Sequence, residues 1–357
     1  MKKRIVQLAA LLMVTAGIHA QTEVTAGIMR GKDYGVTYLL PKTEIVLNVQ
    51  ATKHIYTPGE FCKYAERYLR LTDVATESRE YWTLDKVQTT VAGVPDKDKV
   101  FFVKLKDKTV APLMELTEDG IVRSINMPYS GGKSTKEQPV EATPEPMKLL
   151  DPSTFLTEEI MMANSSAKMA ELVAKEIYSI RESKNALLRG EADNTPQDGA
   201  QLKLMLDNLN QQEASLVAMF AGQTVSEPQT FAIRITPRTM QGSVAFRFSK
   251  KLGVVDDNDL AGEPIYITIT DLKTIDAAAA NAADGEGKKV DGVAYNVPGR
   301  AQVTLTYDHQ KLFESELPVT QFGTTEYLAP VLFNKNTLTK VLFDTATGGL
   351  LKVDRGE

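Results

Sequence analysis

The chain has 357 residues, of which 43% are hydrophobic and 24% are charged, close to the averages of soluble globular proteins. This composition excludes a collagen-like or wholly disordered chain, and the length predicts two or three domains. The formal net charge of -5 has the wrong sign for a non-specific nucleic-acid binder, so we expect no nucleic-acid partner.

The first twenty residues have the pattern of a signal peptide. Three basic residues, Lys2 to Arg4, precede an apolar run over 8–14, and the small-residue site Ile18-His19-Ala20 follows. We predict cleavage near Ala20 and a periplasmic or outer-membrane-associated location for the mature chain. No later window approaches the roughly 20 apolar residues that a spanning helix needs, so we predict no transmembrane span.

Residues 21–127 are predicted to form a β-rich domain. Apolar and polar residues alternate over 45–52, which is typical of a half-buried strand, and Asp119-Gly120 indicates a hairpin turn. One short helix is predicted to begin at Thr57-Pro58-Gly59-Glu60, where a cap hydroxyl, a proline and a carboxylate follow in order. Its aromatic face, which begins at Phe61, is predicted to pack on the sheet, with an exposed ligand platform as the alternative.

Cys62 is the one cysteine of the chain, so no intramolecular disulfide can form. Its spacing with Ala65 and Leu69 on the predicted helix favours a buried position in the core. A bridge to a partner or a nucleophilic thiol is the alternative.

Residues 128–152 contain five prolines and no apolar periodicity, and they are predicted to be a linker. Residues 153–222 are predicted to form a helical hairpin. Asp151-Pro152 is the candidate cap of its first helix, whose apolar residues keep a three-to-four-residue spacing over 163–188 until Gly190.

The second helix of the hairpin is predicted to begin at Thr195-Pro196-Gln197-Asp198 and to end at Gly222. Because the loop between the helices is short, they must run antiparallel. The hairpin is long for the side of a compact domain, so we expect it either to project or to span two domains. A spacer packed on itself and a protein-binding prong are the two interpretations.

Residues 223–357 are predicted to form a C-terminal β-sandwich, because alternating apolar positions recur between Gly, Pro and Asp turns without helices. The segment 275–288 is predicted to be a long solvated loop. The predicted fold class is therefore α+β and multidomain, with an N-terminal β-rich domain, a central helical hairpin and a C-terminal sandwich.

No motif for metal or phosphate chemistry is complete. Gly132-Lys133-Ser134 lacks the earlier glycine of a phosphate-binding loop, and Asp256-Asp257-Asn258-Asp259 lacks the later ligands of a calcium loop. Two histidines and one cysteine in the mature chain fit no zinc spacing. We predict no metal and no cofactor.

No catalytic set converges either. Ser165 and Lys168 have the spacing of a serine-lysine pair without its companion motifs, and His54 and His309 are assigned to a strand and a turn. Trp82 is assigned to the core in preference to a sugar platform. We therefore predict no catalytic residue and a protein that is not an enzyme.

Three stretches of the chain carry a resemblance to a known family: residues 56–69, residues 207–213 and the tail over 317–329. They resemble an uncharacterised family of exported Bacteroidota proteins, domain-of-unknown-function family 4831. The resemblance implies an envelope location and no assigned activity or catalytic residues. It also implies O-glycosylation at Asp344-Thr345-Ala346, with Thr345 as the acceptor.

The function predicted from these observations is that of a non-enzymatic envelope scaffold that binds proteins of the envelope through the hairpin. Its lysines Lys168, Lys175, Lys184 and Lys203 are the expected contact points. A glycan-binding accessory protein and a carboxylate-dependent hydrolase are the two alternatives.

Overall fold

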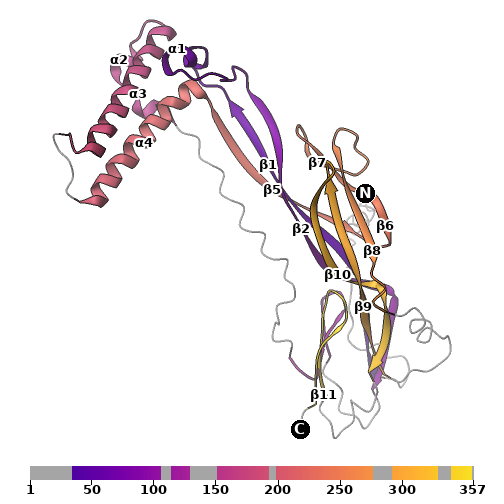
Figure 1. Ribbon diagram of the computed structural model, residues 1–357. Coiled ribbons are helices and arrows are strands. Elements are labelled where there is room, and N and C mark those ends of the chain that lie inside the picture. The colour runs from indigo at the N-terminus through magenta and orange to yellow at the C-terminus, as the bar shows by residue number, and fades with distance from the viewer. Residues whose placement is uncertain are drawn as a thin grey trace, which may run out of the picture.

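The computed structural model describes residues 34–105, 114–128, 151–192, 198–275, 292–328 and 339–355. The predicted signal peptide and nearly all of the predicted linker and of the predicted loop over 275–288 lie outside these ranges. The described chain is elongated, with helices at one end and three antiparallel sheets along the rest (Figure 1). The mostly β content and the few helices confirm the coarse α+β prediction.

The first sheet has three strands in the order β2-β1-β5. They are β1 (Tyr34–Thr57), β2 (Arg79–Leu105) and β5 (Gln223–Ile235). Strand β1 contains 24 residues, which at about 3.3 Å per residue spans on the order of 79 Å. One strand therefore runs nearly the whole length of the molecule.

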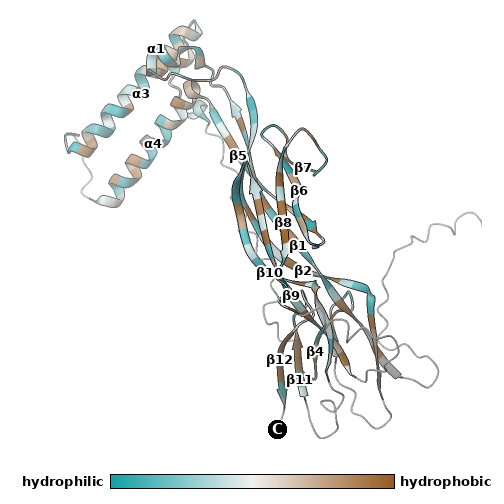
Figure 2. Ribbon diagram, turned by 45° about the vertical axis from the view of Figure 1, so that its right-hand side comes forward, coloured by the Kyte–Doolittle hydropathy of each residue, from teal (hydrophilic) through white to brown (hydrophobic). Residues whose placement is uncertain are grey.

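The second sheet has five strands in the order β10-β9-β8-β6-β7. They are β6 (Met240–Ser249), β7 (Gly253–Val255), β8 (Glu263–Asp271), β9 (Val293–Tyr307) and β10 (Gln310–Leu328). Its inward residues share one core with the first sheet, including Ile45, Leu47, Val49, Ile265, Ile267, Val303 and Leu305. Figure 2 shows the apolar residues on both groups of strands.

This shared core corrects the prediction of a β-rich domain over 21–127 and a separate sandwich over 223–357. The sandwich is formed between these two segments, because β1 lies at the centre of one sheet and pairs with β5 from the other segment. The physical reason is that the apolar face of the β1–β2 hairpin must be covered, and the five-stranded sheet covers it.

A third sheet, in the order β12-β11-β4-β3, lies at the end opposite the helices. Its strands are β3 (Met114–Leu116), β4 (Val122–Ile125), β11 (Thr339–Phe343) and β12 (Leu350–Arg355). The turn predicted at Asp119-Gly120 connects β3 to β4. Within it only Gly120 has a positive φ, of 83°, so this hairpin does not use the type I′ turn, which needs two such residues.

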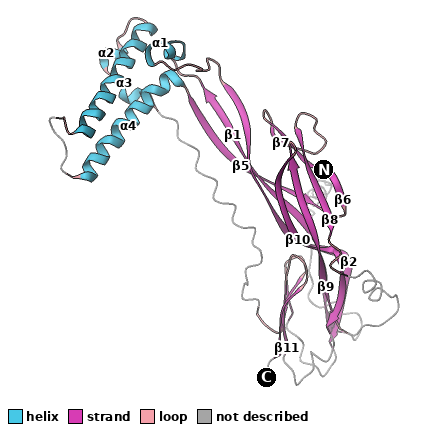
Figure 3. Ribbon diagram, in the orientation of Figure 1, coloured by secondary structure: helices cyan, strands magenta, loops and turns pink. Residues whose placement is uncertain are grey.

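The helices form one unit at the end of the first sheet, which we call the helical head (Figure 3). It contains the single turns η1 (Cys62–Tyr64) and η2 (Pro152–Phe155) and the helices α1 (Ala65–Leu69), α2 (Glu158–Met161), α3 (Ser166–Arg189) and α4 (Gly199–Ala221). Helices α3 and α4 form the predicted hairpin. No helix in the described ranges is both long and apolar enough to cross a membrane.

The helix ends were predicted with mixed success. Gly190 and Gly222 end α3 and α4 as expected, and Asp198 is the N-cap of α4. Residues 195–197 of the predicted cap lie outside the described ranges. The first predicted cap was wrong: Asp151 caps only the short turn η2, and Ser165 caps α3.

The prediction for the first short helix was also wrong in two respects. Thr57 ends β1, and the helical turns that follow have no side-chain cap. The aromatic face packs within the helical head and not on the sheet, because Phe61 is fully buried against Phe220 of α4, with ring centroids 5.5 Å apart. The long helices offer this face an apolar surface that the sheet, covered by its own partner sheet, does not.

Candidate functional site

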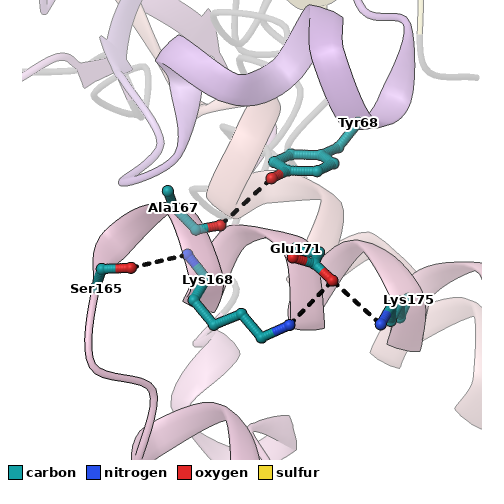
Figure 4. Close-up of polar contacts among 6 residues, drawn as sticks. All are labelled: Tyr68, Ser165, Ala167, Lys168, Glu171 and Lys175. Atoms are coloured by element: carbon teal, nitrogen blue, oxygen red, sulfur yellow. Dashed lines mark hydrogen bonds and ion pairs between the residues drawn. The ribbon is translucent and has the colours of Figure 1, made fainter.

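Ser165 and Lys168, which have the spacing of a catalytic serine-lysine pair, lie at the start of α3 (Figure 4). The Ser165 Oγ accepts a 3.2 Å hydrogen bond from the backbone N–H of Lys168, which is the geometry of an N-cap. The Nζ atoms of Lys168 and Lys175 lie 3.0 and 3.1 Å from the carboxylate of Glu171. Hydrogen bonds from these two lysines hold the pKa of Glu171 below its usual range. The pair therefore begins the helix, and its lysine is engaged by a carboxylate.

The distal half of the hairpin exposes apolar side chains. Leu188 at the end of α3 is 65% exposed, and Leu204 near the start of α4 is 62% exposed. Helix α4 buries residues only in its last part, from Ser215 to Phe220, where it meets the rest of the helical head. Both helices therefore carry exposed apolar side chains in the distal part of the hairpin.

A second surface lies on the neck, which we define as residues 52–57, 79–83 and 223–228 of the first sheet, between the sandwich core and the helical head. The strand register places Arg79, Tyr56 and Thr224 in one cross-strand row, and Tyr81, His54 and Ser226 in the next row. Alternate residues of a strand point to the same face, so both rows share one face of the neck.

The side chains of the second row form a hydrogen-bonded chain. His54 Nδ1 lies 3.0 Å from Ser226 Oγ, and His54 Nε2 lies 2.9 Å from Thr83 Oγ1. Thr83 donates a 3.0 Å hydrogen bond to Asp85, and Thr52 donates a 2.5 Å hydrogen bond to the other oxygen of the same carboxylate.

The carboxylate fixes the direction of this chain, because an ionised carboxylate only accepts hydrogen bonds. The Thr83 proton points to Asp85, so Thr83 Oγ1 accepts from the Nε2–H of His54. The Nδ1 of a neutral His54 is then the acceptor for the Ser226 hydroxyl. Sequence reasoning assigned His54 to a strand correctly and did not foresee these partners.

The first row and Tyr81 of the second row line a shallow hollow of about 460 Å³, which we call the neck hollow. Its lining residues are Tyr56, Arg79, Tyr81 and Thr224. The Arg79 guanidinium lies over the Tyr56 ring, 5.3 Å from the ring centroid. The Tyr81 ring stacks on the His54 imidazole at a centroid distance of 4.8 Å and an interplanar angle of 23°.

A larger hollow, of about 920 Å³, opens at the edge of the sandwich between β5 and β6. Its lining is mainly apolar and includes Phe231, Ile233, Met240 and Val244, which are half-buried. Asp256 and Asp257 contribute to it, but no described group of three metal-ligating side chains gathers there or elsewhere in the described ranges. The hollow is the incompletely covered edge of the core.

The remaining candidates from the sequence lie apart from the neck hollow. Trp82 packs against the core and Phe231, as predicted. His309 lies in the turn between β9 and β10, where Asp308 and His309 have positive φ values of 46° and 61°. Cys62 is half-buried in η1 with a free thiol.

Thr345 lies half-buried in the turn between β11 and β12. The preceding carboxylate, Asp344, accepts hydrogen bonds of 2.9 Å from the backbone N–H of Ala346 and from the Thr347 hydroxyl. The backbone of this turn packs closely on Gly93 of β2. Glycosylation of Thr345 stays a prediction, and the sugar would be attached to a turn that the fold holds in place.

These features define an elongated β-sandwich protein with a helical head at the end of a three-stranded neck. The family model described as "Domain of unknown function (DUF4831)" matches residues 34–351, and the chain belongs to this family. The match includes both sheets of the sandwich, the neck and the helical head. Neither the curated proteins nor the solved structures contain a match.

The neck residues were missed because they come from three strands that are far apart in the sequence. The local signal is the alternation of polar and aromatic side chains at Thr52, His54 and Tyr56 and again at Arg79, Tyr81 and Thr83. That alternation indicates an exposed sheet face. It does not show which strand lies beside which, and so it could not reveal the hollow.

Proposed function

We propose that this chain is an exported, non-enzymatic binding protein whose helical head contacts a protein partner in the periplasm or at the outer membrane. The observation that carries the proposal is the neck. Three paired strands continue past the sandwich core, which ends at Ala51 on β1 and at Trp82 on β2, and hold the helical head beyond it (Figure 1). A paired sheet that separates two parts of a molecule favours a role in presenting one part to a partner over a single compact active site.

The surface of the helical head supports a protein partner. The exposed residues Leu188, Leu204 and Met205 gather apolar area near the free end of the hairpin. The ion pairs of Glu213 with Arg181 and Lys184 lie within two helical turns of Leu188 along α3. An apolar centre with a charged rim is the usual composition of a protein interface.

The experiment compares two exposed leucines in the mature chain, residues 21–357. Leu204 belongs to the helical head, and Leu260, which is 83% exposed, lies between β7 and β8 on the sandwich. Each is changed to glutamate, and partners are cross-linked in the native envelope and identified by mass spectrometry. We expect wild type and Leu260→Glu to capture the same partner and Leu204→Glu to lose it, with equal thermal stability for all three proteins.

Three results would contradict the proposal. The first is a partner that Leu204→Glu retains at wild-type levels. The second is the absence of any reproducible partner for the wild-type chain. The third is weakened capture by both variants, which would show a general effect of charge, because both substitutions introduce the same charge at exposed leucines.

A further inference from the structure

Arg79 is the charged group of the neck hollow, and the fold holds it in place. The Tyr56 ring beneath it is only 8% exposed, and its hydroxyl lies 2.9 Å from the carbonyl oxygen of Ala75 and 3.0 Å from that of Ala221. A guanidinium stacked on a fixed ring loses little freedom when it binds an anion. Among the described residues no carboxylate forms an ion pair with Arg79, whereas the neighbouring Lys53 pairs with Glu80.

Tyr81 supplies an aromatic surface next to this cation. It is 39% exposed, and the stacked His54 fixes the orientation of its ring. His54 is itself held at both ring nitrogens, by Ser226 and Thr83. Strand β2 is an outer strand of the sheet, and at its edge the backbone N–H of the adjacent Trp82 donates a 2.8 Å hydrogen bond to the carbonyl oxygen of Lys250 in the turn between β6 and β7.

The spacing of the two groups suits a single sugar ring. Arg79 and Tyr81 are two residues apart on one strand, so their Cα atoms are separated by about 7 Å on the same face. Thr224 of β5 lines the same hollow. An aromatic face and a cation together match the apolar ring face and the carboxylate of an acidic sugar.

We propose that the neck hollow binds a carboxylated sugar, a hexuronic acid residue, with its carboxylate on Arg79 and its ring stacked on Tyr81. The guanidinium forms a charge-assisted, two-point contact with the carboxylate. This site lies on the neck and is independent of the partner surface proposed for the helical head.

Calorimetric titration of the mature chain with tri-galacturonic acid tests the site, and the fully methyl-esterified trimer is the matched neutral probe. We expect the acid to bind and the ester to bind at least about tenfold more weakly, since a charged hydrogen-bonded pair is lost. Arg79→Gln should weaken binding of the acid by a similar factor. Tyr81→Ser should also weaken it, through loss of stacking.

The control variant is Arg234→Gln, which removes an exposed arginine of the same sheet together with its 3.3 Å ion pair to Glu44. Arg234 lies on β5, ten residues from Thr224 and so about 33 Å along the strand. Its binding should equal that of wild type, and all variants should unfold cooperatively at temperatures well above that of the titration. Arg79→Lys keeps the charge but not the two-point contact and should bind with intermediate affinity.

The proposal is overturned by any of three results. The first is no heat or saturation-transfer signal from the acid at millimolar concentration. The second is equal affinity for the acid and its methyl ester. The third is tighter binding of a short peptide with a free C-terminal carboxylate than of the sugar acid, because that would assign Arg79 to peptide recognition.

Discussion

Glu213 is the residue that joins the two long helices by charge. Its carboxylate oxygens lie 2.6 Å from Arg181 Nε and 2.6 Å from Lys184 Nζ, both on α3. Burial raises the pKa of Glu213, but the hydrogen bonds from Lys184 and Arg181 outweigh this effect and leave the pKa below its usual range. The folded state therefore favours the ionised form.

A depressed pKa has a defined effect on stability. The contribution of Glu213 is complete above the unfolded-state pKa, near 4.3, and disappears as the pH falls through the lower folded-state pKa. We expect Glu213→Gln to lower the free energy of unfolding by about 1 to 2 kcal/mol at pH 7, because Lys184 is left largely buried without its carboxylate. Urea titrations at pH 7 and pH 3 should show the difference from wild type shrinking at the lower pH. A constant difference would show that the carboxylate charge is not responsible.

Ser165 and Lys168 show why single-residue patterns mislead. The same three-residue spacing serves a catalytic pair in one family and a helix cap here, since a side-chain oxygen at the N-cap reaches the amide three residues on. The sequence is compatible with both interpretations. The position of Glu171, whose carboxylate forms an ion pair with the Lys168 ammonium group, favours the helix-cap interpretation.

At the scale of elements, the helical head is attached to the neck by close backbone contact. The backbone N–H of Phe61 donates a 2.7 Å hydrogen bond to the carbonyl oxygen of Met219 on α4. A Cβ at Gly59 would overlap with that carbonyl and with the carbonyl oxygen of Ala218. The segment between β1 and α1 can therefore approach α4 only where residue 59 has no side chain.

We expect Gly59→Ala to destabilise the protein by about 1 to 3 kcal/mol, the usual range for overpacking against atoms that cannot move aside. The matched control is Gly199→Ala, where a new Cβ meets nothing within 4 Å and alanine favours the helix. Thermal unfolding should place the control at or above wild type. Hydrogen exchange of Gly59→Ala should increase in α4 more than in β8 and β9, and uniform exchange would contradict a local contact.

Helix ends were more predictable than helix partners. Gly190 ends α3 in the left-handed conformation, a local property that the residue type carries by itself. The predicted packing partner of the aromatic face around Phe61 was wrong, because an apolar stripe can pack against a sheet or against a helix equally well. The tertiary structure determined the partner, because the long helices had an apolar surface free to contact this face and the sheet did not.

At the scale of the whole molecule, the sandwich depends on two segments that are far apart in sequence. Ile45 and Leu47 from β1 pack in one core with Ile265 and Val303 from β8 and β9. Strands β3 and β4 and the helices η2 to α4 of the helical head lie between β2 and β5 in the chain, so these two strands of one sheet are separated by more than a hundred residues. Neither segment buries its apolar face alone.

We therefore expect the fragment 223–357 to remain unfolded when it is produced alone. Its sheet would expose the apolar residues that β1 and β2 cover, and it would lack the partner of β5. Co-production with fragment 21–222 should restore a folded complex. Dispersed amide NMR signals and cooperative unfolding of 223–357 alone would contradict the shared core.

The sequence by itself determined the local features of this protein: alternating strands, the periodic helices of the hairpin, their glycine ends and the turn at Asp119-Gly120. Each depends on residues that are near one another along the chain. The tertiary structure alone decided that β1 lies between β2 and β5, that one core joins the two β segments, and that His54, Ser226, Tyr81 and Arg79 share one face. The physical reason is that strand pairing uses backbone groups common to all residues, so partners are chosen by burial of whole faces rather than by local sequence.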